Sequence, residues 1–249
     1  MTDRTSQSAR SFAVKANLWL LSATRRWLRI ALVILTIYVS LPFVAPALMK
    51  LGAESPARVL YRVYSPFCHQ FAFRSFFLFG EQSVYPRANT GTSLRPFESY
   101  ATELPDFKGV NFDQFDLPLI SSARRFVGNE QMGYKIALCE RDITIYSALL
   151  LGGLIYAIPN VRRRLRPVPI WLYVVLGLTP IGLDGLSQML GYPPFNFWPV
   201  RETLPIFRVI TGGLFGFMNA WLFFPHMELA MRDTRRQIEY KLYRAGVEF

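Results

Sequence analysis

The residues best suited to chemistry lie in two short motifs that are far apart in the chain. Residues 67–70 read Phe-Cys-His-Gln, and residues 139–142 read Cys-Glu-Arg-Asp. Together the motifs contain both cysteines and one of the two histidines. Thiolates, an imidazole and a carboxylate are the kinds of ligand that zinc accepts. The candidate ligands for zinc or another transition metal are Cys68, His69, Cys139 and Asp142.

The same two cysteines allow other interpretations. An even pair of cysteines on the outer side of a membrane is most simply a structural disulfide, here between Cys68 and Cys139. A redox-active thiol pair is less favoured, because the chain has no C-x-x-C motif. Haem held by two histidines is also disfavoured, since His69 and His226 fall at opposite ends of predicted membrane spans. The disulfide and the metal site remain open alternatives.

The composition places these motifs in a membrane protein. The 249 residues are 51% hydrophobic and 15% aromatic, with a mean hydropathy of +0.21. Such a chain is too apolar for an ordinary soluble domain. The formal net charge is +11, which basic cytoplasmic loops explain better than nucleic-acid binding, because no basic stripe lies away from the membrane flanks. We expect the lipid bilayer, and no nucleic acid, as a partner.

Four stretches with little charge are long enough to cross a bilayer as helices, which takes about 20 residues each. They are residues 30–49, 143–161, 168–190 and 203–225. The sequence therefore predicts an all-α integral membrane protein, a four-transmembrane-helix bundle with interfacial amphipathic helices. The predicted divisions are an N-terminal interfacial segment (1–29), the first span (30–50), an outer interfacial helix (51–80), an insertion (81–137), a core of three spans (138–225) and a basic amphipathic tail (226–249). Small residues in the last span, including Gly212 and Gly216, predict close approach of a neighbouring helix.

The segments between the first two spans differ in kind. In residues 51–80 the four-residue spacing of Val59, Val63, Phe67 and Phe71 predicts an interfacial helix with the Cys-His motif in its middle. Pro66, just before the motif, is expected to bend this helix or to begin a second segment. Residues 81–137 are rich in Pro, Gly, Asn, Asp and Ser, without a long periodic stretch. They predict a long extracytoplasmic loop insertion, and a loop of this length is often functional.

The distribution of charge predicts the topology and a second site. Basic residues crowd the N-terminal segment, the turn at 162–166 and the tail, so the positive-inside rule predicts cytoplasmic N- and C-termini. The remaining ionisable residues then gather at the outer ends of the spans, where isolated charges are costly. The predicted polar cluster consists of Arg74, Arg141, Asp184, Gln188, Arg201, Glu202 and Arg208. It is either a salt-bridge network that ties the helices together or a site where excess arginines hold an anion or lipid headgroup.

No catalytic residue is predicted. The chain has no Walker loop, no G-x-G-x-x-G, no G-x-S-x-G and no H-E-x-x-H. This absence, with the long insertion, favours a non-enzymatic accessory or structural subunit of a larger membrane complex that contacts protein partners through its outer loop. The alternative is a metal-binding or thiol-redox enzyme or sensor at the outer face. Transport is less favoured, because the polar residues of the spans lie near one surface and not at the midplane.

The order of the motifs resembles an uncharacterised family of small predicted prokaryotic membrane proteins, the DUF2085 family. The resemblance covers about residues 55–80 and 137–220, and it implies a prokaryotic cytoplasmic (inner) membrane but no activity. The matching residues are Cys68-His69-Gln70, Arg74-Ser75-Phe76, Cys139, Arg141-Asp142, Tyr146, Asp184-Gly185, Gln188, Arg201-Glu202, Arg208 and Thr211-Gly212. Two features depart from the family pattern: the long stretch 82–135 and Thr144, where the family tends to have Gly.

Overall fold

Long apolar helices dominate this computed structural model, which describes residues 2–248, with side chains from residue 12 onward. Within that part of the chain, three helices are long and apolar enough to cross a membrane: Phe12–Lys50, Ile170–Leu190 and Pro205–Arg244. The first belongs to α1 (Thr2–Lys50) and the third is α9 (Pro205–Arg244). The second joins α7 (Ile170–Leu172), a π-helical stretch (Tyr173–Leu178) and α8 (Thr179–Leu190). The mostly helical architecture agrees with the predicted all-α membrane class.

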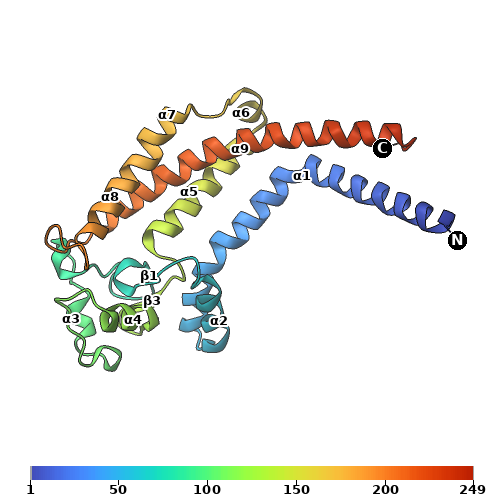
Figure 1. The fold of residues 1–249 in the computed structure, drawn as a ribbon. Coiled ribbons are helices and arrows are strands. Elements are labelled where there is room, and N and C mark those ends of the chain that lie inside the picture. The colour runs from blue at the N-terminus through green and yellow to red at the C-terminus, as the bar shows by residue number, and fades with distance from the viewer. Residues whose placement is uncertain (1, 249) are drawn as a thin grey trace.

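The remaining predicted span corresponds to α5 (Glu140–Ala157), which has 18 residues. Its first turn carries two acids and one arginine, so it is more polar than the three apolar helices. It ends before Pro159 and not at the predicted Val161, because a proline disfavours helical geometry in the residue before it. The short α6 (Pro159–Arg164) follows. At about 1.5 Å per residue, α5 is roughly 27 Å long, and it runs beside α9 (Figure 1).

Glycines allow the close approach of α5 and α9. A Cβ atom at Gly216 would overlap the backbone carbonyl of Ile145, and one at Gly212 would crowd the backbone carbonyl of Arg141. Without side chains at these positions the two backbones can touch, which is how small residues allow helices to pack in membranes. The small residues predicted in the last span therefore lie where a neighbouring helix comes closest.

We expect Gly216→Ala to lower the free energy of unfolding by about 1–3 kcal/mol, the usual cost of overpacking. The clash is with backbone, so no side-chain rotation can relieve it. Gly182→Ala is the matched control, because nothing lies within 4 Å of a Cβ atom at Gly182. Unfolding by denaturing detergent, followed by circular dichroism, compares the two variants. Equal stability of both would contradict the close contact.

The N-terminal half of α1 packs against the C-terminal part of α9. No proline or glycine interrupts residues 2–41, so α1 continues through the predicted boundary at residue 29. Likewise α9 continues through the predicted boundary at residue 225. Leu21 of α1 packs against Ile238 and Leu242 of α9, and both helices extend together toward the two termini (Figure 1). The predicted interfacial segment and tail are thus continuous with the apolar helices and in mutual contact.

The predicted interfacial helix is shorter than expected. Only α2 (Glu54–Tyr64) forms, and it ends just before Pro66, which cannot donate a helical hydrogen bond. Cys68 and His69 therefore lie in an irregular segment beyond the helix, and the prediction that they occupy its middle was wrong.

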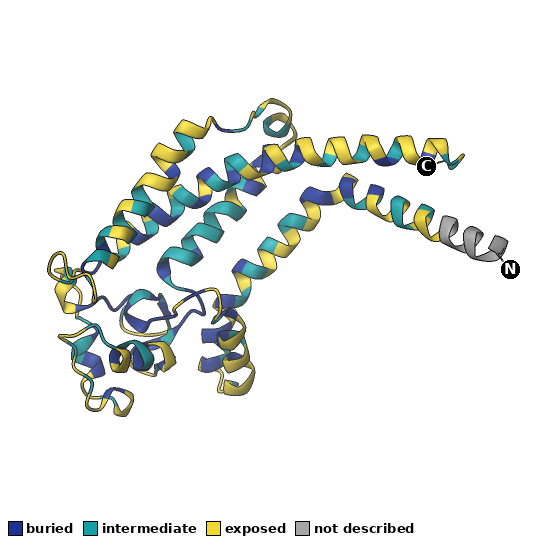
Figure 2. Cartoon of the chain, viewed as in Figure 1, coloured by how far each residue is buried: buried dark blue, intermediate teal, exposed yellow. Residues whose placement is uncertain are grey.

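The stretch predicted as a loop folds into a lobe, defined as residues 72–135. Its core is aromatic: Phe73, Phe77, Tyr85 and Phe97 are each at most 2% exposed, and Figure 2 shows buried residues inside the lobe. Three short strands pair antiparallel in the order β1-β3-β2, so the fold is not purely helical. The elements of the lobe are 3₁₀ turns at Ala72–Arg74, Ala88–Thr90 and Pro105–Phe107, helices α3 (Glu98–Ala101) and α4 (Leu117–Arg125), and strands β1 (Phe77–Leu78), β2 (Gly128–Asn129) and β3 (Gly133–Lys135).

Candidate functional site

Gln70 holds the first cysteine motif against the second. Its backbone has a positive φ of 55°, which turns the chain sharply after Cys68. Its buried side-chain amide donates hydrogen bonds to the backbone carbonyls of Tyr61 at 2.9 Å and Ala137 at 2.7 Å. Ala137 lies two residues before Cys139, so these bonds bring the two motifs side by side.

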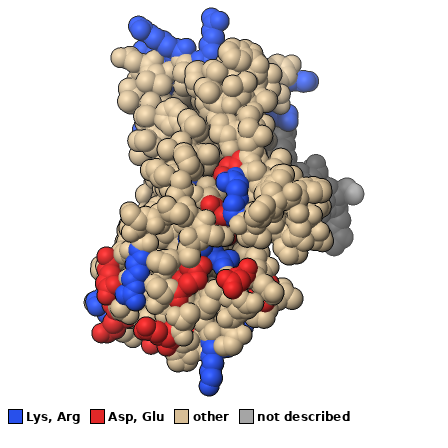
Figure 3. Space-filling view, turned by 90° about the vertical axis from the view of Figure 1, so that its left-hand side faces the viewer, with Lys and Arg blue, Asp and Glu red and all other residues tan. Residues whose placement is uncertain are grey.

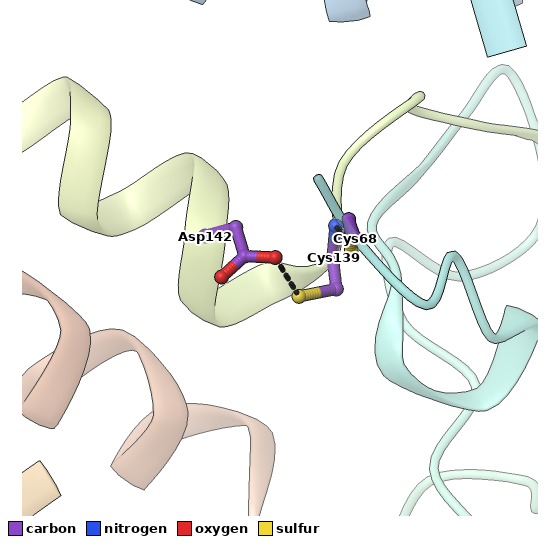
Figure 4. A group of neighbouring side chains, drawn as sticks. All are labelled: Cys68, Cys139 and Asp142. Atoms are coloured by element: carbon purple, nitrogen blue, oxygen red, sulfur yellow. Dashed lines mark hydrogen bonds between the residues drawn. The ribbon is translucent and has the colours of Figure 1, made fainter. Parts of the chain in front are cut away.

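The two cysteines and Asp142 form one compact group, here called the thiol site (Figure 4). The backbone N–H of Cys139 donates to the Sγ atom of Cys68 at 3.0 Å. The Cys139 thiol donates to a carboxylate oxygen of Asp142 at 3.0 Å, one turn along α5. The two Sγ atoms and a carboxylate oxygen all lie within 4.8 Å of one another, and both cysteines are free.

His69 stands beside this group but is not part of it. Its ring nitrogens are not among the ligand atoms that lie within 4.8 Å of one another, and its ring packs against Phe71 at 5.3 Å between centroids. It nevertheless lines the same cavity as Cys139 and Asp142. Desolvation and the nearby charge of Arg74 lower the pKa of His69, so its imidazole is neutral at pH 7, the form that binds metals.

The protonation of Cys139 depends on its neighbours. The side-chain interaction of its thiol with the Cys68 thiol, its burial and the carboxylate of Asp142 raise the pKa of Cys139 well above its ordinary value. The thiol therefore keeps its proton at neutral pH unless a cation replaces it. A metal ion bound here would release protons, because cysteine coordinates as the thiolate.

The cavity beside the thiol site has a volume of about 110 Å³. It lies at the ends of α5, α8 and α9 that face the lobe. Figure 3 shows acidic and basic side chains meeting at this junction, whereas the surface of the helices beyond it is almost uncharged as far as the basic side chains at their opposite end. The lining residues are His69, Phe71, Arg74, Cys139, Arg141, Asp142, Gln188 and Arg208.

Glu202 is the centre of an ion-pair network behind the cavity. Its carboxylate, 1% exposed, accepts two hydrogen bonds from Arg74, at 2.6 and 3.0 Å, and one from Arg208 at 2.6 Å. Gln188 and Tyr192 donate to it as well. Burial alone would raise the pKa of Glu202, but Arg74 and Arg208 outweigh burial and lower it to about 2. The carboxylate is therefore charged across the physiological range.

The other members of the predicted polar cluster are paired in the same way. Arg208 also reaches Glu140 at 3.4 Å, and both side chains are almost fully buried. Asp184 accepts from Arg141 and Arg201 and from the hydroxyl of Thr203. Each of the four arginines in the cluster thus has a carboxylate partner. A salt-bridge network describes this geometry, but the four arginines share only three carboxylates, those of Glu140, Asp184 and Glu202. The alternative, an arginine excess that holds an anion, stays a prediction.

Several residues of the site are absent from the sequence-based prediction. Glu140 and Gln70 belong to the two cysteine motifs, but the sequence predicted no role for either residue. Tyr192 lies in the loop before α9, where the sequence offers no periodic pattern. Thr203, predicted as the first residue of the last span, also lies in this loop, because α9 begins at Pro205. Tyr192 joins the lobe to the network, because its ring stacks on Phe115 at 4.0 Å between centroids and its hydroxyl bonds to Glu202. The role of Tyr192 depends on its contact with Phe115, which lies 77 positions away in the chain. Residue spacing therefore gives no signal for it.

The fold and the site define a small helical membrane protein with a polar site where its helices meet a folded lobe. Residues 130–222 match the profile of the family described as "Predicted membrane protein (DUF2085)". The resemblance predicted from the motifs is confirmed over these residues, which include Cys139 and the network on α5, α8 and α9. The segment with Cys68 and His69 lies outside the match.

One relative is more widely similar. An uncharacterized protein of Methanocaldococcus jannaschii is 26% identical over 196 residues, which cover 77% of this chain and 85% of the relative. No solved structure matches the chain significantly.

Proposed function

We propose that this membrane protein holds a zinc-type metal ion at the thiol site. The observation that carries the proposal is the convergence of Cys68, Cys139 and Asp142 within 4.8 Å. Donor atoms around a tetrahedral zinc ion lie about 3.8 Å apart, given Zn–S bonds of about 2.3 Å. The three donor atoms would need to approach one another by at most about 1 Å to close on one ion. His69 supplies a fourth ligand when its ring turns toward the cavity that it already lines.

Chemically, such a site has two possible uses. Three protein ligands with one open position suit a catalytic zinc ion, whereas four closed ligands suit a structural one. The ion-pair network supports the structural use, because each of its four arginines already has a carboxylate partner. The Nε atom of Arg141 is buried without a hydrogen bond. We therefore infer a metal-stabilised, non-enzymatic site, with the thiol-redox enzyme or sensor as the alternative.

The metal content of the purified full-length protein tests this proposal. We expect about one zinc ion per chain by elemental analysis after purification in mild detergent. Cys68→Ser and Cys139→Ser should each abolish the bound zinc, and His69→Ala should weaken zinc binding by about 10–100-fold. His226→Ala is the matched control, since His226 is exposed on α9, away from the site.

Thiol titration of the same samples decides between the metal and the disulfide. Two reactive thiols after removal of zinc by a chelator support the metal site. No free thiol in the unfolded, unreduced protein, together with no metal, means a Cys68–Cys139 disulfide and overturns the proposal.

We further propose a four-span topology with both termini in the cytoplasm of a prokaryotic cell and the lobe outside. Counting α5 as a span is supported by its packing along α9 through Gly212 and Gly216. The basic residues of α6 lie at the end of the helices opposite the lobe, which supports a cytoplasmic position for that turn.

A role as an accessory subunit is a second candidate, supported by the lobe. The insertion has an aromatic core of its own and is fixed to the helices by Arg74 and Tyr192, so it offers partners a rigid surface. Purification from the native membrane in mild detergent would show a stable companion protein if this is correct, and a lone chain if it is not.

A further inference from the structure

A second cavity lies on the other side of the cysteine motif, between α2 and α4. It is open, with a volume of about 290 Å³. Four arginines line it, two from each helix, and no carboxylate of the described chain does. We call it the basic pocket, and its arginines are Arg58, Arg62, Arg124 and Arg125.

Three of these four arginines have no carboxylate partner among the described residues, unlike the arginines of the ion-pair network. Arg58 forms an exposed pair with Glu54 at 3.2 Å. Arg124 donates to the hydroxyl and backbone carbonyl of Ser65, which fixes its position without cancelling its charge. The guanidinium groups of Arg62 and Arg125 have no hydrogen bond or ion pair with any described residue.

Lys135 adds a titratable amino group at the floor of the pocket. Its ammonium group is completely buried and donates to three backbone carbonyls, those of Gln70, Ala123 and Arg124. Two of these carbonyls belong to the last turn of α4, where a cation is favoured by the helix dipole. Burial lowers the pKa of Lys135 to about 7, so an anion in the pocket would favour its charged form.

The surface next to the basic pocket is apolar. Val59, Val63 and Phe67 are 52%, 54% and 61% exposed, on the face of α2 and the segment just after it. An exposed apolar row beside arginines is typical of a helix that lies at a membrane surface. The pocket would then open at the level of the lipid headgroups.

We propose that the basic pocket binds a phosphate-type oxyanion, from either an anionic phospholipid headgroup or free phosphate. Guanidinium groups suit this ligand because their planar N–H donors match phosphate oxygens. The cluster of unneutralised arginines distinguishes this pocket from the cavity at the thiol site, where every arginine is paired. The proposal is independent of metal binding at the thiol site.

The double variant Arg62→Gln, Arg125→Gln tests the proposal in the full-length protein. Each arginine near anionic headgroups contributes about a fivefold gain in binding, so the double variant should bind about 25-fold more weakly. Both side chains are exposed and unbonded, and the fold should be unaffected, which thermal unfolding would verify. The control Arg163→Gln, Arg164→Gln removes the same charge from exposed positions on α6.

Two probes distinguish the two sources of the oxyanion. Retention of phosphatidylglycerol is measured by native mass spectrometry, and binding of inorganic phosphate by isothermal titration calorimetry. A loss confined to phosphatidylglycerol assigns the pocket to a lipid headgroup, and a loss of phosphate binding assigns it to the free anion. The proposal is overturned if the wild-type protein binds neither probe, if the double variant binds like wild type, or if the control loses as much.

Discussion

Replacing Glu202 with glutamine should lower the free energy of unfolding by about 3–5 kcal/mol, the usual cost of breaking a buried ion pair from one side. The glutamine keeps the shape of the side chain but leaves Arg74 without a negative partner and Arg208 with Glu140 alone, at 3.4 Å. Both arginines are largely buried, with side chains 16% and 4% exposed. Water therefore cannot replace the lost carboxylate. Equilibrium unfolding in denaturing detergent, in the same micelles for all variants, measures the change.

Glu239→Gln is the matched control for this experiment. Glu239 also pairs with an arginine, Arg25, but the two side chains are 32% and 48% exposed. A pair this exposed contributes about 0–1 kcal/mol. If both variants lose the same small amount of stability, Glu202 is not the centre of a buried network.

Acidification should lower the stability of the wild-type protein through the same carboxylate, that of Glu202. The pKa of Glu202 is lowered to about 2, from an ordinary value of 4.5, so on acidification the unfolded chain takes up the proton first. The stability that Glu202 contributes is therefore complete above about pH 4.5 and is lost as the pH falls toward 2. Between pH 5 and pH 3, the melting temperature of the wild type should fall more steeply than that of Glu202→Gln. Parallel curves would contradict this role.

The membrane character of the chain was predictable because it depends only on length and hydropathy. Three of the predicted spans coincide with helices that can cross a bilayer. The helix boundaries were harder to predict. The arginines at 25, 26 and 29 suggested that the membrane helix begins after them, but charge does not end a helix when neither proline nor glycine interrupts it. Leu21 packs against Leu242, 221 positions away in the chain. A contact between residues so far apart cannot be predicted from a single sequence.

The four-residue spacing of apolar residues in the predicted interfacial helix is present in the sequence, but it predicted a helix longer than the one that forms. Val59, Val63, Phe67 and Phe71 are spaced by four residues, yet they do not share one helical face. Phe67 is 61% exposed, whereas Phe71 is buried in the core of the lobe. Pro66 separates the two halves, and its effect outweighs the periodicity because a helix cannot continue normally through it.

The lobe could not have been derived from residue spacing. Apart from the helices α3 and α4, its elements are very short: the strands have two or three residues, and the 3₁₀ turns have three. Elements this short contain less than one period of any hydrophobic pattern. Their aromatic side chains meet through contacts between distant segments, such as Phe73 with Phe97.

The polar cluster was predictable as a group, although its pairing was not. Charged residues at one end of several membrane helices must find partners, because unpaired charge is costly there. Which partner each one finds depends on helix rotation, which the sequence does not specify. Asp184 lies with Arg141 and Arg201, and Arg208 lies with Glu202 and Glu140.

Arg208→Met should lower the free energy of unfolding by about 3–5 kcal/mol, because it leaves two buried carboxylates without their shared cation. Glu140 and Glu202 are each 1% exposed, and Arg208 donates to both. Arg208→Lys should recover part of the loss, since an ammonium group keeps the charge but lacks the planar fork that spans two acceptors. Arg232→Met is the control, because Arg232 is 49% exposed beside Glu228, and it should cost less than about 1 kcal/mol.

A double variant separates charge from packing at Arg208. In Arg208→Met, Glu202 keeps Arg74, whereas Glu140 loses its ion-pair partner. Adding Glu140→Gln removes that unpaired carboxylate, so the combined cost should fall short of the sum by about 0.5–3 kcal/mol. Simple additivity would mean that Arg208 acts through the packing of its side chain alone. Because Arg208 lies on α9, Glu140 on α5 and Glu202 in the loop before α9, non-additivity would show that these charges join the two helices where they meet the lobe.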